Sequence, residues 1–230
     1  MCTRYKLTIE EQELLATYVA EMFMDDYRPR YNIAPTQTVP VLVNREEKRR
    51  IEGFRFGLVP AWAIDSSIGN KLLNARSETV AEKPSFRGAW KHARRCAVLT
   101  DGFYEWKKPE SEKGSKVPHV IEMADRRPFA LAGLWERWGP GDDPLLSVTI
   151  LTTTPNDLLG SIHDRMPVVL GLAEEWDAWV DPAIASDDLT GLFRPYPAEE
   201  MHAYAVSTYV NKPGNEGPQC AEPAAPEMEQ

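Results

Sequence analysis

The spacing of apolar residues along the chain predicts few helices. Thr8 and Glu11 have the pattern of a capping box, and the apolar residues that follow recur at helical spacing over about 15 residues. These apolar residues are Leu14, Leu15, Tyr18, Val19, Met22 and Phe23. The same spacing predicts two short helices later in the chain, at Glu174–Val180 and Asp187–Phe193.

Strands are predicted more often than helices. Tyr27–Pro35, which contains two prolines, is predicted to be a loop, and it precedes a predicted strand pair at Thr38–Asn44 and Arg50–Leu58. The other predicted strands are Cys96–Leu99, Val117–Met123, Phe129–Trp135, Leu145–Leu151, Met166–Leu170 and Ala203–Val210. Because these strands do not alternate with helices, the predicted class is α+β, with a largely antiparallel, barrel-like core and peripheral helices.

Length and composition agree with one domain. A chain of 230 residues is long enough for a single core, and 43% hydrophobic with 27% charged residues is typical of a globular protein. From Lys212 onward Pro, Gly, Glu and Gln dominate, which predicts disorder. We therefore expect one compact domain over residues 1–211 and a disordered, acidic, proline-rich tail over residues 212–230.

The net charge of −9 argues at first against a nucleic-acid partner. Its distribution removes that objection, because residues 171–230 hold 12 Asp and Glu against only Arg194 and Lys212. Of the totals of 35 acids and 26 bases, residues 1–170 therefore keep 23 acids and 24 bases. A basic surface on this larger part of the chain is permitted.

One such surface is predicted by a helix-like segment at Ser77–Arg95. Arg87, Lys91, Arg94 and Arg95 fall at positions that share one helical face. A solvated surface accounts for most stripes of this kind, and a phosphate-facing surface is the alternative.

Three cysteines, Cys2, Cys96 and Cys220, show no Cys-x-x-Cys spacing and no histidine cluster, so we expect neither a zinc site nor any other metal or cofactor. Cys96 lies in an apolar run and is predicted to be a buried structural thiol. Cys220 lies in the predicted tail. No apolar run approaches the length of a membrane span and the N-terminus lacks a signal-peptide pattern, so a cytoplasmic location is expected.

Cys2 is the unusual cysteine, because removal of Met1 would leave an amine and a thiol on adjacent carbons. An α-amine has a pKa of about 7.7–8.0 against about 10.4 for lysine, so far more of it is nucleophilic near neutral pH. The amine can condense with an aldehyde to an imine, and the thiol can then close a thiazolidine ring in an intramolecular step. On position alone, a small residue at an ordinary terminus is the favoured interpretation.

Three other segments carry candidate chemical groups. Glu105 lies among aromatic residues, which would raise its pKa and make it a general acid or base, and a solvent-facing strand glutamate is an equal alternative. His163 lies in a polar turn, where a surface histidine is the common alternative. Asn74 and Arg76 could hold a phosphate or a sugar, unless they only lie in a helix-entry loop capped by Ser77.

Together these segments resemble the SOS-response-associated peptidase family, the abasic-site-processing proteins of bacteria and eukaryotes. The matching pieces occur in the family's order over roughly residues 1–210. They are Met1-Cys2 followed by Arg4, then Tyr31–Gln37, Phe56–Trp62, Asn74–Thr79, Asp101–Trp106, Ala132–Trp135 and Ile162–Pro167. Seven motifs in the same order are specific evidence for this resemblance, whereas one motif alone would be weak evidence.

The resemblance implies a compact β-rich domain with a positively charged groove for single-stranded DNA that ends at Cys2. Cys2 would supply both the amine and the thiol. Glu105 would help open the sugar to its aldehyde and move protons during imine formation, and His163 would assist those transfers. Asn74 would orient the Cys2 end and the sugar.

DNA contacts are also implied by the resemblance. Arg4 and Arg76 match phosphate-holding positions of the family. Trp62 matches an aromatic residue on which a base can stack, and Pro35 and Thr152 match lesser groove contacts. The implied partner is single-stranded DNA containing an abasic site, bound by a monomer without metal or membrane.

This sequence departs from the family pattern at three positions. Thr3 stands where glycine is usual, Phe56 where tryptophan is common, and Ala63 where some members carry a second tryptophan. The last change predicts a weaker wedge against duplex DNA. None of the three affects the proposed chemistry.

Three functions remain to be distinguished. The first is a DNA–protein cross-linking enzyme that shields abasic sites in the SOS DNA damage response, at the nucleoid of a bacterium or in the nucleus of a eukaryote, with possible lyase activity. The second is a cysteine peptidase or autopeptidase that uses Cys2 and His163. The third is a binding module for modified DNA that never becomes covalent.

Overall fold

The computed structural model describes residues 2–109, 114–141 and 143–224, and its centre is a closed ring of five strands. These strands are β4 (Thr38–Arg45), β5 (Lys48–Phe56), β7 (Arg95–Thr100), β10 (Phe129–Trp138) and β11 (Leu145–Thr153). Antiparallel pairing runs in the order β5-β4-β7-β10-β11, and a short parallel pairing of β11 with β5 closes the ring. This is the barrel-like core predicted from the sequence.

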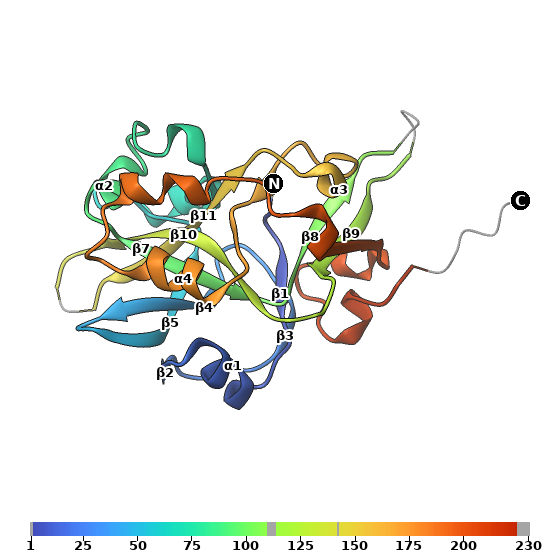
Figure 1. Cartoon of the computed structure of the whole chain (residues 1–230), viewed down its shortest axis with the longest axis horizontal. Coiled ribbons are helices and arrows are strands. Elements are labelled where there is room, and N and C mark those ends of the chain that lie inside the picture. Colours follow the sequence, from blue (N-terminus) through green and yellow to red (C-terminus); the bar gives the residue numbers. More distant parts are fainter. Residues whose placement is uncertain (1, 110–113, 142, 225–230) are drawn as a thin grey trace, which may run out of the picture.

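A second sheet lies beside the barrel and carries the start of the chain. Its strand order is β14-β9-β8-β1-β3, and every pairing in it is antiparallel. The strands are β1 (Tyr5–Leu7), β3 (Arg30–Ile33), β8 (Gly102–Lys107), β9 (Val117–Met123) and β14 (Met201–Ala205). In Figure 1, β1 runs through the middle of the molecule, with β8 and β9 on its right. The α+β class and the largely antiparallel sheets are confirmed.

Short strands extend the barrel sheet. β2 (Glu21–Phe23) pairs in parallel with β5, and β6 (Asn74–Arg76) pairs in parallel with β11. β12 (Met166–Pro167) pairs with β11 and β13 (Val169–Leu170) pairs with β10. The predicted strand at Met166–Leu170 is therefore two short strands on different partners.

The helices are short and peripheral, as Figure 1 shows. The α-helices are α1 (Glu11–Tyr18), α2 (Arg87–Lys91), α3 (Asp157–Gly160) and α4 (Ala173–Val180). Short 3-10 helices of three to seven residues lie at Ser66–Lys71, Ser77–Thr79, Ser186–Leu192, Ala198–Glu200, Thr208–Asn211 and Pro218–Cys220. α4 packs against β4, β7 and β10, and its buried Trp179 donates a hydrogen bond from Nε1 to the Cys96 carbonyl at 2.9 Å. Cys96 is wholly buried, as predicted.

The first helix is shorter than predicted. Val19 takes a left-handed backbone conformation with φ 47° and ends α1, so Met22 and Phe23 lie in β2 instead. The predicted capping box is also wrong. Thr8 donates its backbone N–H and its hydroxyl to the Asp101 carboxylate, because β1 and the start of β8 are neighbours, and no side chain caps α1.

The predicted basic helical stripe does not form. α2 ends at Lys91, and Ala93 takes φ 49°, which turns the chain into β7. Arg94 pairs with Glu136. Arg95 is buried and donates hydrogen bonds to the carbonyl oxygens of Trp179, Asp181 and Ile184 and to the Ser186 hydroxyl.

Two segments predicted to lack regular structure are packed. Tyr27–Pro35 contains β3, which pairs with β1. Residues 212–224 of the predicted tail also pack: the Asn32 side-chain amide donates to the carbonyls of Lys212 and Asn215 at 3.1 and 2.9 Å, and Cys220 is wholly buried. The rest of the predicted tail, residues 225–230, lies outside the described residues.

Candidate active site

Cys2 lies inside the protein directly before β1. Its side chain is 1% exposed and belongs to the main hydrophobic core, and its Sγ lies 4.0 Å from the Arg4 carbonyl oxygen. Burial raises the pKa of the thiol above its ordinary value, and the nearby Glu105 carboxylate raises it further. The thiol is therefore protonated at neutral pH.

Glu105 lies on β8, the strand that pairs with β1, and faces the same interior. Tyr5 pairs with Phe103 across the two strands, so Glu105 follows two residues later on the same face of the sheet. Its side chain is 2% exposed, and burial raises its pKa, while the charge of His163 lowers it. A carboxyl group with a raised pKa keeps its proton to a higher pH than an ordinary glutamate does, which favours it as a general acid.

His163 lies in the turn between α3 and β12. The Asn156 side chain caps α3 by accepting from the Leu159 N–H at 2.9 Å, and the His163 N–H donates to the Leu159 carbonyl at 2.8 Å. The His163 Nδ1 atom accepts a hydrogen bond from the Arg165 backbone N–H at 3.0 Å and lies 2.9 Å from the Asp164 carboxylate. These contacts fix the ring in a pocket of about 310 Å³ that Trp106 also lines.

Asn74 and Arg76 lie on β6, at the edge of the barrel. β6 pairs with β11 so that Asn74 is opposite Ile150 and Arg76 is opposite Thr152. The Asn74 side-chain oxygen is buried and accepts no hydrogen bond from any residue of the described ranges. The Arg76 side chain is exposed.

Arg165 joins these elements, and the sequence analysis gave it no role. Its guanidinium binds both carboxylate oxygens of Glu78 at 2.5 and 2.9 Å and donates to the Thr152 carbonyl at 2.6 Å. Thr152 is wholly buried. Arg165 thereby ties the His163 turn to β11 and to the 3-10 helix Ser77–Thr79 that follows β6. Its place within the motif Ile162–Pro167 was the signal that could have identified it.

Arg4 is held inside the second sheet. Its guanidinium donates to the Asn32 side-chain oxygen at 2.7 Å and to the Val210 carbonyl at 3.0 Å, and it lies 5.9 Å from the centre of the Trp106 ring. Burial lowers its pKa. This side chain therefore links β1 to β3 and to the 208–211 turn.

Trp62 and Pro35 lie in two loops at the barrel end. The Trp62 side chain is 59% exposed, and its Nε1 donates to the Pro84 carbonyl at 3.3 Å. Pro35 is half-buried in the turn after β3.

Neither a metal-binding cluster nor a helix that could span a membrane is found among the described residues. No group of three or more His, Cys, Asp or Glu side chains comes together as a metal site in that part of the chain. Likewise, none of its helices has the length and apolar character needed to cross a bilayer.

A buried thiol beside the chain start, an interior carboxyl group and an imidazole thus come together from β1, β8 and the α3–β12 turn. The model of the SOS response associated peptidase (SRAP) family matches residues 1–213, so the chain belongs to this family. The resemblance to this family that the sequence motifs indicated is confirmed.

Individual relatives carry more specific names. The chain is 41% identical to the abasic site processing protein YoqW of Bacillus subtilis, over 96% of this chain and 99% of that protein. It is 33% identical to the abasic site processing protein HMCES of Gallus gallus, over 86% of this chain and 67% of that protein. A solved structure of a Bacteroides thetaiotaomicron protein superposes with a TM-score of 0.85 at 26% identity, covering 97% of this chain and all of the other.

Proposed function

We propose that this protein processes abasic sites in single-stranded DNA and becomes covalently joined to them through Cys2 after Met1 is removed. The names of relatives that match nearly the whole chain support abasic-site processing. The observation that carries the chemistry is the burial of Cys2 against Glu105, whose own charge is influenced by His163. The thiol and the carboxyl group thus influence each other electrostatically, and the imidazole influences the carboxyl group.

The reaction begins with the ring-opened abasic sugar, whose C1 is an aldehyde. The free α-amine of Cys2 attacks C1, and loss of one water gives an imine. The Cys2 sulfur then adds to the imine carbon while the thiol proton moves to the nitrogen, which closes a thiazolidine ring. The net change is the loss of one water, with no oxidant or reductant.

The order of these steps suits a thiol whose pKa is raised. The amine makes the first bond, so the thiol has no need to be a thiolate in the resting protein. Its addition is intramolecular, and proximity compensates for its low acidity. By contrast, a peptidase nucleophile requires a lowered thiol pKa, which is the opposite of the direction found at Cys2.

Glu105 is proposed to carry protons in both steps. In its protonated form it donates to the sugar ring oxygen as the ring opens and to the leaving hydroxyl of the carbinolamine. His163 is proposed to assist these transfers, and Asn74 to orient the sugar through its amide. The DNA strand is proposed to contact Pro35, Trp62 and Arg76, and the buried Arg4 and Thr152 are proposed to support that surface from beneath.

The test is a denaturing gel with a single-stranded oligonucleotide that carries one abasic site. The wild-type protein, with Met1 removed as shown by intact mass, is expected to shift the oligonucleotide without borohydride. Cys2→Ala keeps an amine and loses the thiol, so it is expected to give a shift only after borohydride traps the imine. A tag that blocks the N-terminus is expected to abolish both shifts.

Cys220→Ala is the matched control, because it removes a buried thiol far from the N-terminus in sequence. It is expected to cross-link as the wild type does. A borohydride-independent shift with Cys2→Ala would refute the proposal. Turnover of a peptide without DNA would favour the peptidase, and salt-sensitive binding that never becomes covalent would favour a binding module.

A further inference from the structure

The hairpin formed by β8 and β9 carries three lysines beside the His163 pocket. Lys107 is the last residue of β8, Lys108 follows it, and Lys116 directly precedes β9. Lys108 and Lys116 line the same pocket of about 310 Å³ as Trp106, His163 and Asp164. The pocket therefore joins the candidate active site to a group of cations.

The register of the hairpin sets two of these cations against each other. Lys107 is paired with Val117, so Lys108 and Lys116 follow as the next facing positions. Like charges at facing positions of two strands destabilise a hairpin. None of the three lysines forms an ion pair with a residue in the described part of the chain.

The carboxylates nearby do not neutralise this group. Asp164 also lines the pocket, and its carboxylate lies 2.9 Å from His163 Nδ1. On the other side of the hairpin, Lys107, Lys108 and Lys116 line a second pocket of about 860 Å³ with Glu222 as its acidic residue. Two adjoining pockets thus share Lys108 and Lys116 as their common wall.

We propose that Lys108 and Lys116, with Lys107 beside them, bind the phosphates of a DNA strand on one side of the abasic nucleotide. An anion between two facing lysines removes their mutual repulsion, and successive phosphates can follow the two pockets away from His163. The site binds the phosphodiester backbone of single-stranded DNA and does not distinguish one base from another. This inference names a binding surface for the strand in the proposed function and therefore rests on that function.

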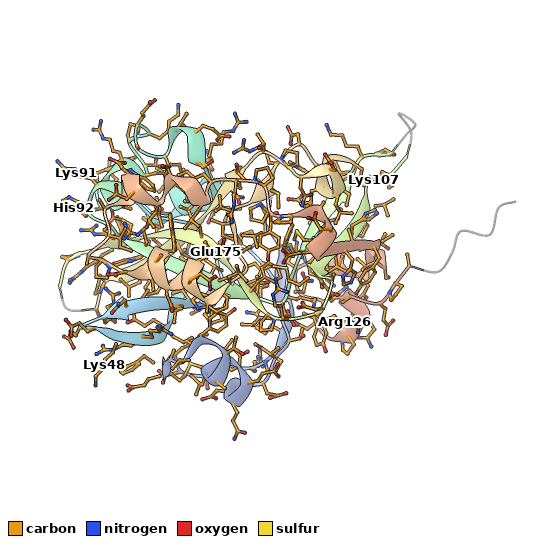
Figure 2. All side chains as sticks on the ribbon, viewed as in Figure 1. Lys48, Lys91, His92, Lys107, Arg126 and Glu175 are labelled. Atoms are coloured by element: carbon orange, nitrogen blue, oxygen red, sulfur yellow. The ribbon has the colours of Figure 1, made fainter. Side chains whose placement is uncertain are left out.

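The test compares Lys108→Ala/Lys116→Ala with Lys48→Ala/Lys91→Ala, which changes the net charge equally. Figure 2 shows Lys107 at the right of the molecule and Lys48 and Lys91 at its left. The probe is an oligonucleotide without an abasic site, titrated at several salt concentrations. Each lost phosphate contact is expected to reduce the slope of log affinity against log salt by about 0.7.

Loss of two phosphate contacts makes the slope of the hairpin variant shallower by about 1.4. A fourfold rise in salt concentration therefore lowers the affinity of the wild type about sevenfold more than it lowers the affinity of the hairpin variant. The control variant is expected to keep the wild-type slope. Equal slopes for wild type and hairpin variant, or an equal change in the control, would overturn the inference.

Two abasic oligonucleotides then locate the strand, one with all its flanking nucleotides 5′ of the lesion and one with all of them 3′. The hairpin variant is expected to bind only one of them more weakly, and equal weakening of both would contradict the inference. Failure of the wild type to cross-link would refute the proposed function, and the salt slopes would still test the hairpin.

Discussion

Glu105 is a buried carboxyl group, and its proposed role in the chemistry would come at the expense of stability. A carboxyl group with almost no exposure to water is costly to ionise, and burial accordingly raises its pKa from the ordinary value of 4.5. The protein keeps this side chain in the interior next to Cys2 and within the electrostatic influence of His163. Because burial of this carboxyl group lowers the stability of the resting protein, we expect the residue to have a functional role.

The first prediction concerns the pH dependence of stability. Because the pKa of Glu105 is higher in the folded than in the unfolded protein, its favourable contribution is present below about pH 4.5 and is lost as pH rises through the folded pKa. Glu105→Gln cannot ionise, so it is expected to lose less stability than wild type between about pH 4 and pH 7. Urea denaturation at a series of pH values measures this, with the exposed Glu47→Gln as control. Parallel curves for wild type and Glu105→Gln would contradict the prediction.

The second prediction concerns the rate of reaction. If Glu105 carries protons, Glu105→Gln slows both formation and reversal of the cross-link by about a hundredfold or more, because a general acid or base contributes about that much. Time courses on denaturing gels, with release measured after transfer to excess competitor DNA, provide the rates. Unchanged rates in both directions would remove Glu105 from the mechanism.

At the scale of elements, β1 holds the reactive terminus in place through two cations. Arg4 connects β1 with β3 and the 208–211 turn. Lys6 is buried and its Nζ lies 2.9 Å from a Glu122 oxygen on β9 and 3.4 Å from an Asp101 oxygen before β8. A strand of three residues has too few backbone hydrogen bonds to be rigid alone, so these side chains fix the position of Cys2.

The third prediction follows from that anchor. Lys6→Met leaves two buried carboxylates without their cation, and breaking a buried ion pair from one side costs about 3–5 kcal/mol. Urea denaturation is expected to show a loss of that size, and the exposed Lys48→Met a negligible one. A loss below about 1 kcal/mol for Lys6→Met would show that the remaining partner of Glu122, His202, compensates.

On the scale of the whole molecule, residues 212–224 pack against the strands that support the candidate site. Asn32 on β3 bonds to the carbonyls of Val210, Lys212 and Asn215, and Arg4 bonds to both Asn32 and Val210. Cys220 packs in a small cluster with Tyr104 and Val206. Residues on both sides of position 211 therefore belong to one packed unit.

The fourth prediction tests, by truncation after Asn211, whether the residues on both sides of position 211 form one packed unit. The shortened chain loses two of the three acceptors of the buried Asn32 amide and uncovers the cluster around Tyr104, so its thermal midpoint is expected to fall by several degrees. Calorimetry of the two proteins provides the comparison. An unchanged midpoint would show that residues 212–224 contribute nothing to stability.

Sequence alone determined the strands whose apolar runs are long. β4, β7, β10 and β11 were located because most of their residues are buried, so hydrophobicity itself marks them. β5 buries only Ile51, Phe54 and Phe56, and these apolar residues mark it. The site residues were found through short ordered motifs, since Cys2, Glu105 and His163 are far apart in the chain. β1 and β3 were missed because three or four residues are too few for a periodic pattern.

What only the tertiary structure decided is which polar groups meet. Arg95 was predicted to lie on an exposed helical face and instead caps carbonyl groups in the interior. Thr8 was predicted to cap a helix and instead binds Asp101. Arg165 had no predicted role and connects the His163 turn to β11 and to the 3-10 helix Ser77–Thr79. Hydrophobic burial follows from local composition, whereas the partner of a buried polar group depends on long-range packing that local sequence does not contain.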